Sequence, residues 1–203
     1  VAALLGAALS LGAAQDAPKS LKIVSSLPRT GSANSQTTSM VNGIMLAIEE
    51  RGGAVDGFKI EYEDMDDASP QRGNWDPAVE AANANKAASD QRIVGYIGTY
   101  NSGASKIAMP ILNKAGLVMI SPGNTYPGLT KPGTGEQNEP RIYRPTGKIN
   151  YFRVVPTDDL QGAVAAEWCK ELGAKKVFVM HDRELYGKGI ADYQHQQKRA
   201  ADI

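Results

Sequence analysis

The stretch that decides the fold runs from Ile93 to Thr130 and reads IVGYIGTYNSGASKIAMPILNKAGLVMISPGNTYPGLT. It opens with the apolar run Ile93–Gly98, which is typical of a buried strand. A helical pattern follows over Ser102–Ala115, Gly116 supplies a helix stop, and a second apolar run covers Leu117–Ile120. Strand, helix and strand in this order predict a parallel βαβ unit.

The same alternation continues on both sides of this unit. The dipeptide Asp76-Pro77 marks a helix start, with Asp as the cap and Pro at the first helical position. The whole pattern predicts an α/β fold with parallel, doubly wound sheets. The remaining expected strands are Leu21–Leu27, Phe58–Met65, Phe152–Val155 and Lys176–Met180, and the remaining helices are Thr37–Arg51, Asp76 to about Ser89, Thr157–Leu172 and a helix from Gly187 onward.

In sheets of this kind, ligands bind beyond the carboxyl ends of the strands, where helices begin. Four loops follow predicted strands and are therefore the places to search for a site. A longer loop, Ser121–Asn150, is rich in Gly, Pro, Asn and Thr, and we expect it to be a surface excursion near the site. The four loops are Pro28–Gln36, Thr99–Ser102, Ser121–Tyr126 and His181–Gly187.

Composition excludes several classes of function. The chain of 203 residues holds 22 Lys plus Arg and 22 Asp plus Glu, so the formal net charge is zero. A nucleic-acid surface or a polybasic membrane anchor would show a basic excess. The hydrophobic fraction of 42% predicts a packed core, and the single cysteine, Cys169, rules out an internal disulfide.

The first 14 residues differ from the rest. Val1–Ala14 is apolar and rich in small residues, which matches the core and cleavage zone of a secretory signal and is too short to span a bilayer. The alternative is a buried N-terminal helix. With a signal peptide at residues 1–14, clipped at its start, the protein is expected to be periplasmic or otherwise extracytoplasmic.

Enzyme motifs fail on inspection. Gly133-Thr134-Gly135 lacks the third glycine of a dinucleotide site, and Gly147-Lys148 lacks the rest of a phosphate loop. His181 and His195 are poorly spaced for a metal, and no nucleophile is paired with His181 in sequence. The sequence therefore predicts no catalytic residues, no metal site, no cofactor and no enzyme activity.

With its neighbouring segments, Ile93–Thr130 resembles the leucine/isoleucine/valine-binding proteins of ABC uptake systems. The resemblance implies a two-lobe type I periplasmic-binding-protein fold, of which this chain is an N-terminal fragment. Residues 15–153 would form lobe 1 without its C-terminal elements, and residues 154–203 would begin a truncated lobe 2. The supporting segments are LKIVSSLPRTG at Leu21, YEDMDDASP at Tyr62, VVPTDDLQG at Val154 and VFVMHDRELYGKG at Val177.

The resemblance also implies a ligand site. Ser102 matches the serine that holds an amino-acid carboxylate, Gly123 and Thr125 match a carbonyl and a threonine of the next loop, and Tyr186 matches a tyrosine of the second lobe. Gln36 stands where relatives carry an aromatic residue. The group that binds the ligand ammonium would lie beyond Ile203. Asn101 and Asn124, beside Ser102 and Thr125, complete the candidate ligand-binding residues.

Ordinary structural roles remain open for two of these residues: Ser102 as a helix cap and Thr125 as a turn-stabilising hydroxyl. The expected function is capture of a small amino-acid-like ligand, with a branched-chain amino acid favoured, and delivery to an ABC permease. We expect a monomer that binds no nucleic acid. The alternatives are a ligand-sensing receptor domain of the same fold, a binding protein for urea, short amides or aromatic acids, and a hydrolase that uses Ser102 and His181.

Overall fold

A computed structural model describes residues 19–200 of the chain, and the expected signal sequence, residues 1–14, lies outside this range. A six-stranded sheet in the order β2-β3-β1-β6-β7-β8 forms the main body. All neighbouring strands are parallel except β2, which pairs antiparallel with β3. The strands are β1 (Ser20–Leu27), β2 (Ala54–Val55), β3 (Phe58–Asp66), β6 (Ile93–Gly98), β7 (Val118–Ser121) and β8 (Tyr151–Arg153).

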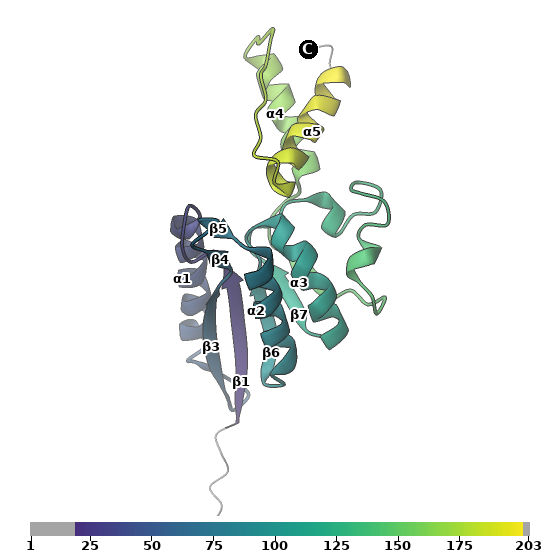
Figure 1. Cartoon of the computed structure of the whole chain (residues 1–203). Coiled ribbons are helices and arrows are strands. Elements are labelled where there is room, and N and C mark those ends of the chain that lie inside the picture. Colours follow the sequence, from purple (N-terminus) through teal and green to yellow (C-terminus); the bar gives the residue numbers. More distant parts are fainter. Residues whose placement is uncertain (1–18, 201–203) are drawn as a thin grey trace, which may run out of the picture.

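Helices cover both faces of the sheet, as predicted. Helix α1 (Asn34–Glu50) lies on one face, and α2 (Pro77–Ser89) and α3 (Ser102–Ala115) lie on the other (Figure 1). Because side chains alternate along a strand, the two faces carry different residues. The well-buried core lies under α2 and α3 and includes Val24, Tyr96, Met119, Ala84, Ala108 and Leu112. Ile23, Ile60 and Ile97 instead line an apolar groove beside α1.

Helix ends follow the sequence signals. The Asp76 carboxylate accepts hydrogen bonds from the backbone N–H groups of Ala78 (2.8 Å) and Val79 (3.4 Å), which caps α2. Gly116 ends α3 in the left-handed conformation, at φ 71°. The predictions for β1, β3, α2, β6 and α3 are confirmed to within one residue at each end, while α1 begins three residues before the predicted Thr37.

A small hairpin was not predicted. Strands β4 (Ala68–Ser69) and β5 (Asn74–Trp75) pair antiparallel after the end of β3. The β1–α1 loop packs directly on this hairpin: Ser32 N–H donates to the Gly73 carbonyl at 3.2 Å. Its strands are two residues long, so no alternating pattern could reveal them.

The long loop is more ordered than a surface excursion. It contains two 3-10 turns, η1 (Pro127–Leu129) and η2 (Arg141–Tyr143), and it closes around the buried carboxylate of Glu139. Lys106 from α3 pairs with this carboxylate at 2.7 Å, Tyr126 donates to it at 2.9 Å, and Tyr143 also donates. Burial alone would raise the pKa of Glu139, but these bonds outweigh it and hold the pKa below its usual value.

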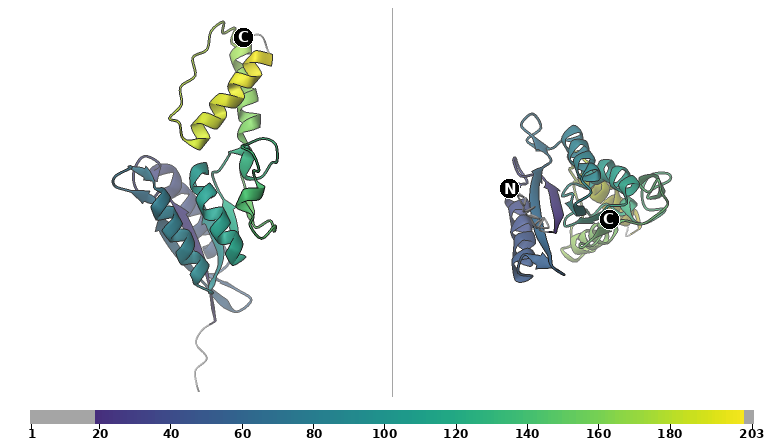
Figure 2. Two further views of the ribbon diagram at one scale, coloured as in Figure 1. Left: turned by 45° about the vertical axis from the view of Figure 1, so that its right-hand side comes forward. Right: turned by 90° about the horizontal axis from the view of Figure 1, so that it is seen from below.

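Two helices, α4 (Asp158–Glu171) and α5 (Leu185–Ala200), pack against each other above the carboxyl ends of the strands (Figure 1; Figure 2). The prediction of a strand at Lys176–Met180 is wrong. Residues 176–180 form no strand, and Phe178 and Met180 are more than 80% exposed. A strand exists only within a hydrogen-bonded ladder, and the described chain provides no sheet in this part. Within the same described range, no helix is long and apolar enough to cross a membrane.

The contact between Gly31 and the hairpin gives a stability test. A Cβ atom on Gly31 would lie 2.1 Å from the Gly73 carbonyl oxygen, and Gly31 has φ +78°. We expect Gly31→Ala to lower the free energy of unfolding by about 1–3 kcal/mol. The added methyl group would clash with the Gly73 carbonyl, and alanine is strained in the left-handed backbone conformation of Gly31. Urea denaturation followed by circular dichroism measures the change.

Gly43→Ala is the matched control. Gly43 lies inside α1, and a Cβ atom there would have no neighbour within 4 Å. Alanine should raise the free energy of unfolding by roughly 0.5–1 kcal/mol, since glycine weakens a helix interior. If both substitutions changed the free energy of unfolding by the same amount and in the same direction, the contact between Gly31 and Gly73 would not hold the hairpin.

Candidate ligand-binding site

The register of the sheet brings the ends of its strands together. Ile97 pairs with Ser25 on one side and with Ile120 on the other, and Ile120 pairs with Phe152. The loops after β6 and β7 therefore leave the sheet side by side. Five of the seven candidate residues lie in these two loops and in the first turn of α3, namely Asn101, Ser102, Gly123, Asn124 and Thr125.

Ser102 is the first residue of α3 and is 2% exposed. Its Oγ accepts a hydrogen bond from Tyr126 N–H at 3.3 Å, which links the first turn of α3 to the loop after β7. The O–H of Ser102 remains as a donor toward an acceptor. Asn101 is the N-cap residue, but its side chain does not cap the helix, and its Oδ1 is buried without a hydrogen-bond partner.

Thr125 lies against the start of α4. The Asp158 N–H donates to the Thr125 carbonyl at 3.0 Å. The Thr125 hydroxyl faces the Asp158 carboxylate and lowers the pKa of that acid, although the two groups do not meet in a regular hydrogen bond. Asp158 is fully buried, and burial dominates, so its pKa rises to about 6.

Asn124 holds its loop in place. Its side chain is fully buried, accepts from Ser105 and from Tyr151 Oη at 2.9 Å, and donates to the Tyr100 carbonyl at 3.0 Å. Gly123 lies beside Tyr100, whose ring would be 3.0 Å from a Cβ atom at position 123. A larger residue at 123 would press on this ring.

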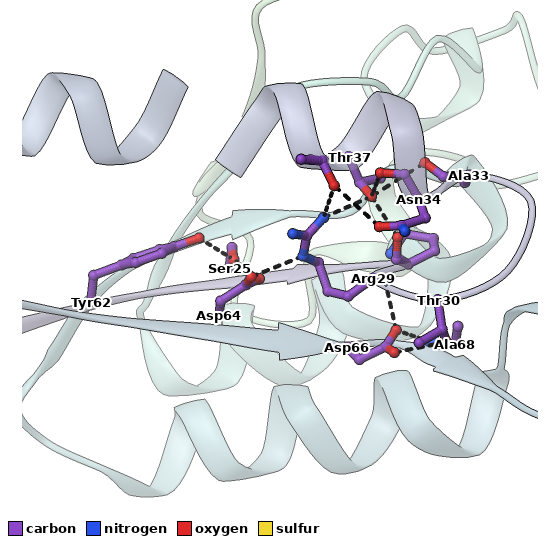
Figure 3. Close-up of polar contacts among 12 residues, drawn as sticks. Ser25, Arg29, Thr30, Ala33, Asn34, Thr37, Tyr62, Asp64, Asp66 and Ala68 are labelled. Carbon is purple, nitrogen blue, oxygen red and sulfur yellow. Dashed lines mark hydrogen bonds and ion pairs between the residues drawn. The ribbon is translucent and has the colours of Figure 1, made fainter. Parts of the chain in front are cut away.

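Gln36 lies in the first turn of α1, exposed, and accepts from Ser35 Oγ at 2.9 Å. The loop before it is fixed by Arg29, whose Nε donates to Asp64 at 2.8 Å and whose Nη1 donates to Thr37 at 3.1 Å (Figure 3). The Arg29 N–H also donates to Asp66 at 2.8 Å. This network fastens the start of α1 to the end of β3.

Tyr186 lies in the first turn of α5 and is 45% exposed. Two residues earlier, Glu184 approaches Arg72 of the β4–β5 turn at 3.4 Å, so the hairpin and α5 meet. Among the described residues, no hydrogen bond joins Gln36 or Tyr186 to the group around Ser102 and Thr125. These two residues lie on other elements, at the starts of α1 and α5.

The geometry gives no support to a hydrolase. His181 is exposed, its Nδ1 accepts from Arg183 N–H at 3.0 Å, and no hydrogen bond connects it to Ser102 in the described structure. In residues 19–194, no group of three or more His, Cys, Asp or Glu side chains is placed to hold a metal ion.

Sequence reasoning missed two residues that organise the site, Arg153 and Asp158. Arg153 ends β8, and its guanidinium donates to the loop after β7. A charged residue at the end of a sheet strand, directly before a helix start, is the signal that could have identified Arg153. For Asp158 the sequence predicts only a place in the first turn of the helix that begins at Thr157.

The comparisons with known proteins agree with this architecture. The family model for periplasmic binding proteins matches residues 20–202, so the chain belongs to that family. It is 30% identical over 168 residues to a Pseudomonas aeruginosa protein named "Amino acid binding protein", a match that covers 81% of this chain and 40% of the relative. The chain thus spans less than half the length of this relative.

Solved structures show the same fold. The branched-chain amino acid transporter substrate-binding protein LivJ of Streptococcus pneumoniae, in complex with isoleucine, matches with TM-score 0.71 and 28% identity, over 88% of this chain and 47% of LivJ. A solute-binding protein of R. palustris in complex with 4-hydroxybenzoate matches with TM-score 0.73 over 90% of this chain and 44% of that protein. At 19% identity, this second match shows the fold alone. The relatives are substrate-binding proteins and not enzymes.

The buried carboxylate of Asp158 predicts a pH dependence. Its folded-state pKa of about 6 lies above the usual 3.8, so unfolding releases its proton between these values. The contribution of Asp158 to the free energy of unfolding therefore falls as pH rises through this window. We expect the stability of Asp158→Asn, relative to the unsubstituted protein, to increase from about pH 4 to about pH 6 and then level off, as measured by urea denaturation.

Asp159→Asn is the neighbouring control with the opposite sign. Burial raises the pKa of Asp159, but the hydrogen bond from Lys131 and the nearby Thr157 hydroxyl outweigh it, so the net shift is downward. The unsubstituted protein should therefore lose stability relative to Asp159→Asn as pH falls. A flat difference for Asp158→Asn across the whole range would show that this carboxylate is not buried as described.

Proposed function

We propose that this chain is the first ligand-binding lobe, with the start of the second, of an exported solute-binding protein that captures an amino acid. A branched-chain amino acid is the favoured ligand, and an ABC permease is the proposed recipient. The observation that carries this proposal is the placement of the Ser102 and Thr125 hydroxyls on adjacent loops, beside neighbours that favour opposite hydrogen-bonding polarity.

The polarity follows from the neighbours of each hydroxyl. Ser102 Oγ already accepts from Tyr126 N–H, so its proton is left to donate to a carboxylate. It also stands at the N-terminus of α3, where the helix dipole favours negative charge. The Thr125 hydroxyl makes no hydrogen bond to a described residue, but it lies beside the Asp158 carboxylate, which can only accept when ionised. If the Thr125 proton turns toward that carboxylate, the lone pairs of Thr125 are left for a donor such as an ammonium group.

A carboxylate and an ammonium on the same carbon atom are the signature of an α-amino acid. An aromatic carboxylic acid would satisfy Ser102 but bring no donor to Thr125. Relatives named for amino acids are 30% and 31% identical to this chain over matched segments of 168 and 180 residues, which supports the same choice. Charge-assisted hydrogen bonds contribute roughly 1.5–3 kcal/mol each, so two or three of them plus burial of a small aliphatic group are sufficient for micromolar affinity.

Two lobes are needed to enclose such a ligand. We assign residues 15–153 to lobe 1 and residues 154–203 to the start of lobe 2, after a signal sequence at residues 1–14. Helix α4 presents an apolar stripe at helical spacing that is more than half exposed, formed by Leu160, Val164, Trp168 and Leu172. This stripe is the face that further strands of lobe 2 would cover. Both candidate hydroxyls are closed off from solvent in this conformation, and we propose that a ligand reaches them when the lobes part.

The test is a titration of the complete protein by calorimetry. Ser102→Ala and Thr125→Ala should each weaken leucine binding by about 1–3 kcal/mol while leaving the fold intact. The two variants should differ with the deaminated analogue of leucine, which has the carboxylate but no ammonium. Ser102→Ala should weaken its binding, and Thr125→Ala should not.

Ser39→Ala, an exposed position on α1, is the control and should bind leucine like the unsubstituted protein. Unchanged leucine affinity in both site variants would remove Ser102 and Thr125 from the site. Binding of the aromatic acid 4-hydroxybenzoate in preference to leucine would contradict the amino-acid assignment.

A further inference from the structure

We propose that Arg153 is a positioning residue that seats the ligand loop, Gly123–Tyr126, and ties this loop to the segment that crosses between the lobes. The inference rests on the proposed function, because it assumes that the loop binds ligand. In this proposal Arg153 does not contact the ligand itself and acts through the backbone of the loop.

The guanidinium of Arg153 makes three hydrogen bonds to one stretch of chain. Nη1 donates to the carbonyl oxygens of Asn124 (3.1 Å) and Tyr126 (2.9 Å), and Nη2 donates to Thr130 Oγ1 at 2.7 Å. The cation also lies 5.8 Å from the centre of the Tyr151 ring. The planar fork of arginine spreads its donors over separate acceptors, which a single ammonium cannot reproduce.

These bonds flank Thr125 on both sides. The carbonyl between the two Arg153 acceptors, that of Thr125, accepts from Asp158 N–H at 3.0 Å. Three consecutive carbonyls of the loop are therefore bound by residues 153 and 158, and their orientation is fixed before any ligand arrives. Such pre-organisation lowers the ordering cost of binding.

Arg153 also stands at the junction of the lobes. It is the last residue of β8, the final strand of the sheet along the chain, and five residues later α4 begins at Asp158. A second link runs in parallel, since Lys131 donates to Thr157 Oγ1 at 2.8 Å and to Asp159 at 2.7 Å. Movement of the crossing segment therefore acts on the ligand loop through Arg153.

The test uses Arg153→Lys in the complete protein, because lysine keeps the charge and loses the fork. We expect leucine affinity to fall by about tenfold or more, and amide hydrogen exchange in residues 121–130 of the ligand-free protein to become faster, while exchange in α2 stays unchanged. Arg141→Lys is the matched control, because Arg141 lies in the same long loop, is exposed, and its side chain donates to Asn138 and to no other residue in the described part of the chain. It should change neither quantity.

Thr130→Val provides a second, milder variant that removes one acceptor of the fork. It should weaken leucine binding in the unsubstituted protein and have no further effect in Arg153→Lys, because the two positions act through one bond. The proposal is overturned if Arg153→Lys keeps both the leucine affinity and the exchange rates of the unsubstituted protein, or if the Thr130→Val effect is fully additive. If the complete protein does not bind leucine but amide exchange is still faster in Arg153→Lys, the positioning role stands and only the amino-acid ligand is refuted.

Discussion

The pairing register of the parallel sheet sets where each loop leaves it. One row of paired residues crosses β3, β1, β6, β7 and β8 and consists of Asp64, Ser25, Ile97, Ile120 and Phe152. Because parallel strands end at the same edge, residues far apart in sequence begin their loops together. Ser102 and Thr125 are neighbours for this reason, joined through Tyr126 N–H. A shift of one residue in the pairing of β6 with β7 would separate them and also turn Met119 away from the core.

Burial gives the polar groups at this edge their chemistry. Asn124, Asp158 and Glu139 are almost completely enclosed, so each must be satisfied by neighbours or remain poised for a partner. Asn124 and Glu139 are satisfied and hold loops in place. Asp158 is not, and its carboxylate lies next to the Thr125 hydroxyl. The site thus combines rigid support with one acidic group whose hydrogen-bonding capacity is not filled within the described chain.

The fold could be predicted from sequence wherever local signals and burial agreed. Asp76-Pro77 and Gly116 marked helix ends, and the apolar runs at Ile93 and Leu117 marked central strands. Three features escaped because they depend on distant partners. The β4–β5 hairpin is held by Ser32, the role of Arg153 depends on a loop more than twenty residues earlier, and residues 176–180 have strand composition without a sheet to join. Sequence reasoning put five candidate residues on two loops that the sheet brings side by side, and their contact with a ligand stays a prediction. It could not show that the Asn124 side chain supports its own loop, because its partners Ser105, Tyr100 and Tyr151 come from other elements.

The central claim is that the ligand is an amino acid enclosed by two lobes, of which this chain supplies the first and the beginning of the second. Calorimetric titration of leucine into the complete protein and into residues 15–203 alone tests it most directly. The account predicts binding to the complete protein near −8 kcal/mol, roughly micromolar, and binding to residues 15–203 weaker by more than about a hundredfold. Comparable affinity, together with sharp cooperative melting of residues 15–203, would contradict the two-lobe account.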